Sequence, residues 1–149
     1  MLPKKLFGKQ WLEYWREHNV KRFEEIIKDK DGFCYIKGVS QDEIDQAEKK
    51  LGIKFSGDYV EYLLKYGVAT FDGHELTGIC SSTRLNVVDV TLLERQNNLQ
   101  VSNEMYVVED TCYDGILVWQ DNSGAVYETI PGSGIKKVAS GLAEYYQNS

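Results

Sequence analysis

Apolar residues recur at helical spacing in the first part of the chain. Trp11 and Trp15 are four positions apart, and similar spacing continues through residues 9–29, which predicts a helix there. The stretch "DKDG" at 29–32 contains turn residues that should end this helix. Residues 33–38 form a short, β-prone stretch, so we expect either a strand or an extended linker there.

The next stretch has the clearest helix signals in the chain. Ser40 is followed three positions later by Glu43, which is the spacing of a capping box. Gly52 stands where a helix ends in a left-handed residue, and a second helix is predicted from Ser56 to Gly67. We therefore predict two short helices joined by a tight turn. The first should bury a stripe formed by Ile44, Ala47 and Leu51.

Three tyrosines, Tyr59, Tyr62 and Tyr66, lie along one side of the second predicted helix. Such a stripe is either a binding platform or part of the packing. The helix also carries Val60, Leu63 and Leu64, so apolar residues lie nearly all round it and little of its surface can face water. We predict a buried scaffold helix whose tyrosine hydroxyls reach the edge of the core or a polar partner.

The second half of the chain is mostly β-prone. Asp72-Gly73 is a hairpin turn signal within residues 69–79. A short helix is expected near 88–97, where Thr91 and Glu94 repeat the capping-box spacing. An antiparallel meander is then predicted from three β-rich runs, at 105–110, 115–120 and 125–130.

One core residue is predicted within this meander, and a loop and a helix are predicted after it. Trp119 is predicted to face the core, because it follows Leu117 at an even offset on one strand face. The stretch "PGSG" at 131–134 is expected to be a loop. Ser140 is expected to cap a closing helix.

The net charge of −6 is unevenly distributed along the chain. Residues 1–54 hold twelve Lys/Arg and ten Asp/Glu, whereas residues 55–149 hold five and thirteen. Within 66–135 the only basic residues are Arg84 and Arg95, against ten carboxylates. This one-signed surface disfavours nucleic acid as a direct ligand and favours a basic partner. A solvated acidic face without any partner would have the same composition.

Length and cysteine content indicate one reduced domain. The 149 residues can bury a hydrophobic core without disulfides. The three cysteines are far apart and lack a CxxC pair, so neither a disulfide framework nor a zinc site is indicated. No apolar run is long enough for a signal peptide or a membrane span, so we expect a cytoplasmic protein.

Residues suited to catalysis are sparse. His74-Glu75 lacks the second histidine of the HExxH zinc motif, so a surface histidine beside a turn is predicted. Cys112 has carboxylate neighbours that raise a thiol pKa, and it is interpreted as an ordinary thiol. Turn chemistry accounts for the acids of the meander better than a Ca²⁺ site or a glycosidase pair. We expect no catalytic residue, no metal and no cofactor, although a pocket with two perturbed carboxylates would favour a small hydrolase.

The order of these motifs resembles the SUKH superfamily. The resemblance is carried by "VSQDEIDQAE" at 39–48, Leu51-Gly52 and "YVEYLLKYG" at 59–67, followed by "GILVWQDNSGAVYE" and "VASGLAEYY". It covers about residues 38–147 and departs from the family pattern at Ser56-Gly57, where a proline often stands. The resemblance implies an α+β fold, with N-terminal helices and a C-terminal helix packed on a mostly antiparallel, meander-type sheet. Residues 1–149 would form one such domain, with 1–32 as an N-terminal helical segment.

The resemblance also implies a function. The family is known mainly for immunity proteins that neutralise bacterial toxins, many of them nucleases, and some members are regulatory protein-binding domains. The members most like this chain are implied to inhibit a secreted nuclease toxin of the LXG type. The expected partner is therefore a cognate nuclease toxin with a basic surface, and the alternative is a regulatory interaction domain without a toxin. Pairing with a second copy through the Trp11/Trp15 helix stays open.

An acidic surface with two tyrosine anchors is the candidate binding site. A nuclease must present positive charge to phosphates, so an acidic, aromatic surface can dock on its active site. We expect the partner to contact nine residues: Asp72, Glu75, Glu109, Asp110, Tyr113, Asp114, Asp121, Tyr127 and Glu128.

Overall fold

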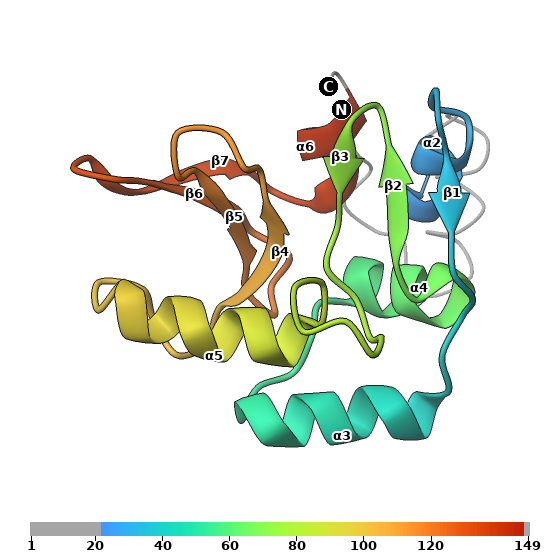
Figure 1. Cartoon of the computed structure of the whole chain (residues 1–149), viewed down its shortest axis with the longest axis horizontal. Coiled ribbons are helices and arrows are strands. Elements are labelled where there is room, and N and C mark those ends of the chain that lie inside the picture. Colours follow the sequence, from blue (N-terminus) through green and yellow to red (C-terminus); the bar gives the residue numbers. More distant parts are fainter. Residues whose placement is uncertain (1–21, 148–149) are drawn as a thin grey trace, which may run out of the picture.

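A computed structural model describes residues 22–147 as an arrangement of helices around two antiparallel sheets. The sheets have the strand orders β1-β2-β3 and β4-β5-β6-β7. They meet at an isolated antiparallel bridge between Leu76 and Glu109. Figure 1 shows them side by side, with α4 and α5 below the strands and α3 at the bottom of the view. The predicted α+β class is confirmed, with two sheets in place of one.

The elements follow one another in the order predicted for most of the chain. Their bounds are α2 Phe23–Lys28, β1 Cys34–Tyr35, α3 Gln41–Leu51, α4 Gly57–Tyr66, β2 Ala69–Phe71, β3 His74–Glu75, α5 Val87–Asn97, β4 Tyr106–Asp110, β5 Leu117–Gln120, β6 Val126–Ile130, β7 Gly134–Ala139 and α6 Leu142–Gln147. Trp11, Trp15 and most of the helix predicted over 9–29 lie outside the described residues.

The predicted helix ends of α3 are confirmed. The Ser40 hydroxyl oxygen accepts a hydrogen bond from the Glu43 N–H at 3.2 Å, and the two side chains meet at 3.4 Å. Gly52 has φ 69°, and the Ile53 N–H donates to the Glu48 carbonyl at 3.1 Å. This left-handed cap turns the chain directly into α4.

The hairpin predicted around Asp72-Gly73 joins β2 to β3. Asp72 has φ 48° and Gly73 has φ 79°, the two positive values that a type I′ turn needs. The Asp72 N–H also donates to the Asp31 carbonyl at 2.8 Å, which holds the hairpin against the turn before β1.

Two predictions for the second half are wrong in detail. The helix near 88–97 is present as α5, but Asn86 caps it, with its side chain accepting from the Val88 N–H at 2.9 Å. Thr91 is fully buried inside the helix and accepts from the Val107 N–H of β4 at 3.0 Å. The residues after the 131–134 loop form a strand, β7, that was not predicted. It is an edge strand with a mostly exposed surface, so it lacks the buried alternation that marks a strand in sequence.

The four-stranded sheet has apolar residues on both faces. Tyr106, Val108 and Val118 belong to the larger core shared with the helices of the N-terminal part and α6. Val107 and Trp119 belong to a smaller cluster that Val90 of α5 covers. The prediction that Trp119 faces the core is confirmed.

The tyrosine stripe of α4 is packing, as predicted. Tyr59, Tyr62 and Tyr66 are buried, and each hydroxyl has a polar partner. Tyr59 and Tyr62 reach the side chain and the carbonyl of Thr77, each at 2.9 Å, and Tyr66 donates to the Glu24 carbonyl at 3.0 Å. The stripe therefore ties α4 to α2 and to the segment after β3.

Candidate functional site

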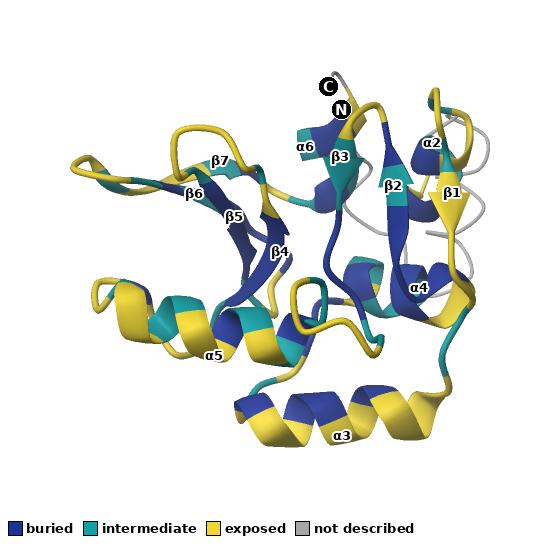
Figure 2. Cartoon of the chain, in the orientation of Figure 1, coloured by how far each residue is buried: buried dark blue, intermediate teal, exposed yellow. Residues whose placement is uncertain are grey.

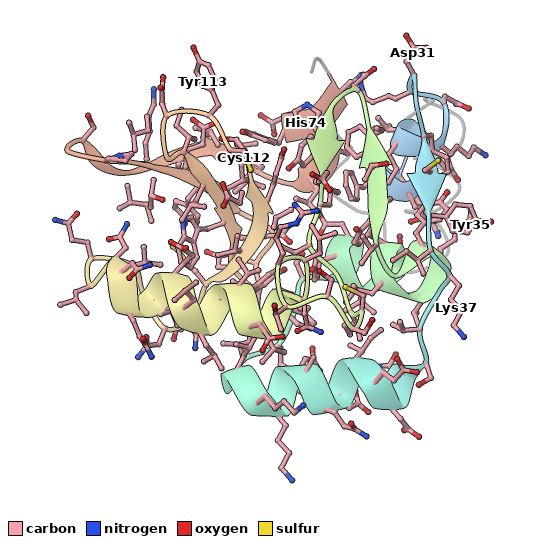
Figure 3. The ribbon with its side chains drawn as sticks, viewed as in Figure 1. Asp31, Tyr35, Lys37, His74, Cys112 and Tyr113 are labelled. Carbon is pink, nitrogen blue, oxygen red and sulfur yellow. The ribbon has the colours of Figure 1, made fainter. Side chains whose placement is uncertain are left out.

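Four of the nine predicted contact residues lie together at one edge of the molecule. We call Glu75, Asp110, Tyr113 and Asp114 the acidic edge, whereas Asp72 lies apart, in the hairpin turn beside Asp31. The bridge between Leu76 and Glu109 sets β3 against β4, so Glu75 lies opposite Asp110. Figure 3 shows Tyr113, Cys112 and His74 along the same upper side of the molecule. The edge combines the β2–β3 hairpin with the β4–β5 loop.

The β4–β5 loop holds Tyr113 away from the protein. Tyr113 is 69% exposed. Asp110 accepts from the Cys112 N–H at 2.9 Å, and the Thr111 hydroxyl oxygen accepts from the Tyr113 N–H at 3.2 Å. Cys112 and Asp114 have φ 56° and 53°, a left-handed conformation that costs a non-glycine residue energy. These bonds brace an aromatic side chain between two exposed carboxylates.

Arg84 belongs to this edge and was missed in the sequence. Its guanidinium donates to both oxygens of Glu75, at 2.9 and 3.3 Å. These bonds lower the pKa of the Glu75 carboxyl. The signal available in the sequence was that Arg84 is one of only two basic residues within 66–135. Because Glu75 is paired with Arg84, Asp110 and Asp114 give the edge its net charge. Asp72, outside the edge, is paired with Lys30 at 3.7 Å.

Glu109 does not belong to the exposed surface, so this prediction is wrong. The residue is 3% exposed, and its carboxylate accepts from the Tyr146 hydroxyl at 2.7 Å. His74 Nδ1 lies 2.9 Å from the same carboxylate, which also corrects the prediction of a simple surface histidine. A shift in strand register between Val107 and Glu109 explains the burial, because such a bulge turns a side chain to the other face.

Asp121, Tyr127 and Glu128 lie away from the acidic edge. Asp121 is in the β5–β6 turn, at the other end of β5 from the β4–β5 loop, and accepts from the Tyr127 hydroxyl at 3.2 Å. Glu128 accepts from the Tyr145 hydroxyl at 2.5 Å. Tyr127 and Glu128 are neighbours on one strand and so point to opposite faces. The nine predicted residues therefore do not form one surface.

Cys112 is an exposed thiol whose pKa is raised, chiefly by the negative charge of Asp110. Glu75 raises it further, and Arg84 opposes the shift. The prediction that neighbouring carboxylates raise this pKa is confirmed. A thiol kept protonated in this way is a poor nucleophile.

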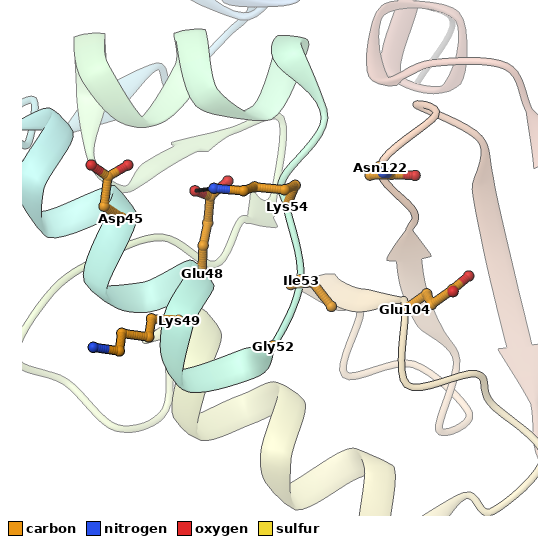
Figure 4. Close-up of a pocket in the computed structure, with 8 residues that line it drawn as sticks. All are labelled: Asp45, Glu48, Lys49, Gly52, Ile53, Lys54, Glu104 and Asn122. Atoms are coloured by element: carbon orange, nitrogen blue, oxygen red, sulfur yellow. Dashed lines mark ion pairs between the residues drawn. The ribbon is translucent and has the colours of Figure 1, made fainter.

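An open groove lies on the other side of the molecule, between the α3–α4 turn and two loops of the sheet (Figure 4). It encloses about 620 Å³ and is lined by Asp45, Glu48, Lys49, Gly52, Ile53, Lys54, Glu104 and Asn122. Glu48 is buried there, accepts from the Phe55 N–H at 2.8 Å and pairs with Lys54 at 3.5 Å. This carboxylate therefore supports the turn between the two helices.

The described residues show no assembled metal site. Within 22–147 no group of three or more His, Cys, Asp or Glu side chains could hold a metal ion. Nor does any helix in this part of the chain combine the length and the apolar character that a membrane span requires.

The fold and the surface define an α+β domain whose exposed acidic edge is suited to contact with another protein. The family described as SMI1-KNR4 cell-wall (SUKH_6) matches residues 41–145. The chain belongs to this family and so to the SUKH superfamily, whose members are generally non-enzymatic domains of immunity or cell-wall-related protein interaction. No curated protein matches the chain.

Proposed function

We propose that this chain is an immunity protein that binds and neutralises a cognate secreted nuclease toxin of the LXG type. Inhibition is by protein–protein contact and needs no cofactor. The observation that carries the proposal is the braced Tyr113 between Asp110 and Asp114 at the acidic edge. Membership of a superfamily associated with immunity supports it.

The negative charge of this edge favours its association with a nuclease. A nuclease active site carries positive charge for phosphate, and an opposite field on the inhibitor speeds their encounter. Within 66–135 the field stays negative because ten carboxylates outnumber the two arginines. Arg84 offsets the charge of Glu75 only, and Arg95 is held by the carbonyls of Leu51, Asn103 and Met105. Tyr113 would supply an aromatic anchor inside the acidic rim.

The proposed contact set differs from the sequence prediction. Glu109 is left out because it is buried. Asp121 and Tyr127, which are hydrogen-bonded to each other, would form a separate, second contact area if the toxin reaches them, whereas Glu128 lies on the opposite face of the strand. We place the encounter in the cytoplasm, where a nuclease finds its substrate.

The test is co-expression with the toxin encoded by the adjacent gene, with cell survival as the readout. Wild-type protein should restore growth, and purified protein should bind a catalytically inactive form of that toxin. Asp110→Asn with Asp114→Asn should weaken binding about tenfold at low salt, and Tyr113→Ala by about tenfold. Asp42→Asn with Asp45→Asn makes the same charge change on exposed positions of α3 and should leave binding within about twofold. Cell death that this protein does not prevent would refute the immunity function.

A second candidate is a regulatory interaction domain without a toxin. The description of the matching family as a cell-wall family favours it. The acidic edge would then bind a basic surface of a host protein. An adjacent gene that encodes a long protein with an LXG-like N-terminal region supports the toxin; its absence supports the regulatory domain.

A further inference from the structure

α5 exposes two leucines although it covers a sheet. It buries Val87 and the polar residue Thr91 completely, whereas Leu92 and Leu93 are 42% and 56% exposed. A helix that covers a sheet normally turns its leucines inward. Figure 2 shows the exposed side of α5 facing away from the strands. Such a local inconsistency is expected at sites kept for function.

The surroundings of Leu93 are acidic. Asp89 lies one turn before it on the same helix face and is exposed. Glu94 follows it, and Asp110 of the acidic edge lies close enough to contribute, after partial burial, to the raised pKa of the Glu94 carboxyl. An apolar centre with a charged rim is the usual anatomy of a protein-binding surface.

No free positive charge of α5 balances this rim. Arg95 is the only basic residue of the helix, and its guanidinium donates to the Leu51 carbonyl at 3.2 Å and the Asn103 carbonyl at 2.7 Å. These bonds hold it toward α3, on the flank of α5 opposite Leu93. The Leu93 flank therefore combines exposed apolar area with net negative charge.

We propose that Leu93, with Asp89, Glu94 and Asp110 around it, is a docking site for a basic amphipathic helix of the protein partner. The apolar face of that helix covers Leu93, and its lysine or arginine side chains meet the three carboxylates. A second copy of this chain fits poorly, because its own rim would bring like charges together. The proposal rests on the proposed function, since it extends the toxin contact from the acidic edge onto α5.

The site can be tested without any toxin. The probe is a synthetic peptide of roughly five helical turns with leucine on one face and lysine on the other. Its comparator has glutamate in place of every lysine. Binding to ¹⁵N-labelled protein is followed by NMR, and affinities are measured by fluorescence anisotropy at about 0.05 M and about 0.5 M salt.

The lysine peptide should shift the amide signals of residues 89–97 and 110 and bind at least about tenfold more tightly than the glutamate peptide. Leu93→Ser should weaken binding about tenfold at both salt concentrations, because apolar contact is hardly screened. Asp89→Asn with Glu94→Gln should weaken it at low salt and less at high salt. Ile36→Ser is the matched control, since Ile36 is 64% exposed on the far side of the molecule, and should change affinity by less than about twofold.

The site is overturned if the lysine peptide does not bind, if the two peptides bind equally, or if Leu93→Ser binds like the wild type. Circular dichroism on each variant separates lost binding from lost folding. Because this experiment uses no toxin, its failure removes the α5 site alone, whereas failure of the survival assay removes the immunity function.

Discussion

Replacing Tyr62 with phenylalanine should destabilise the protein much more than the same change at Tyr59. Both rings are fully buried, and both changes remove one oxygen while leaving the ring in place. The difference lies in what each hydroxyl leaves behind. The pair therefore isolates the cost of unsatisfied polar groups from the cost of a cavity.

The Tyr62 hydroxyl serves two backbone groups. It accepts from the Ala69 N–H at 3.0 Å and donates to the Thr77 carbonyl at 2.9 Å. Tyr62→Phe would leave a buried donor and a buried acceptor unpaired, at about 1–3 kcal/mol for each group. We expect a loss of about 3 kcal/mol in the free energy of unfolding, since part of each cost is recovered by local relaxation.

The Tyr59 hydroxyl serves only one side chain. The Thr77 hydroxyl already donates to the Val107 carbonyl at 2.8 Å, so it accepts from Tyr59 at 2.9 Å. In Tyr59→Phe the Thr77 hydroxyl still donates to the Val107 carbonyl and loses only the hydrogen bond that it accepts from Tyr59. We expect a loss of about 1 kcal/mol.

Urea unfolding at pH 7, followed by circular dichroism, measures both values. The m-value should match that of the wild type, so that the midpoint shift reports stability. Equal losses for the two variants, within about 0.5 kcal/mol, would contradict the hydrogen-bond argument. A loss below about 1 kcal/mol for Tyr62→Phe would show that water or a backbone shift satisfies both groups.

Three further predictions concern the same core. Burial raises the pKa of Tyr62 well above its usual value. Its contribution to stability is therefore complete below the unfolded pKa of about 10 and is lost as the pH rises above that value. Urea midpoints should fall between about pH 9 and pH 11, and they should fall less in Tyr62→Phe. His74→Ala should lower the free energy of unfolding by about 2–4 kcal/mol, because it removes the Nδ1 partner of buried Glu109. Adding Glu109→Gln should restore part of this loss in a double-mutant cycle, and no recovery would mean that the pair is not coupled. Asp58→Ala should cost about 2–3 kcal/mol, because Asp58 accepts from the Leu142 N–H at 3.0 Å, and hydrogen exchange should show α6 opening first; exchange unchanged at α6 would argue against this link.

Local signals were enough to predict most elements. The Ser40 and Gly52 ends of α3 and the Asp72-Gly73 hairpin depend on a few adjacent residues, so their sequence patterns are sufficient. Thr91 shows the limit of the same reasoning. Its spacing to Glu94 matches a capping box, but its hydroxyl is used sixteen residues away, on Val107 of β4. A sequence pattern does not distinguish a local cap from a long-range bond.

The candidate site was harder to predict because it depends on how two separate segments meet. Glu75 and Asp110 are far apart in the chain and become neighbours only through the bridge between β3 and β4. The sequence indicated that the region is acidic, and this was sufficient to favour a basic partner. It did not indicate that Arg84 neutralises Glu75 or that Asp121 lies at the opposite end of the sheet.

The bulge in β4 decides which of two neighbouring carboxylates is buried and which is exposed. Tyr106 and Val108 face the larger core and Val107 faces α5, as regular alternation requires. Continued alternation would turn Glu109 toward α5, but the register shift after Val107 puts it on Tyr146, on the same side as Val108. Asp110 is consequently exposed beside α5, where its charge reaches Glu94. The extra residue in β4 thus buries Glu109, which links the strand to Tyr146, and exposes Asp110 at the proposed docking surface.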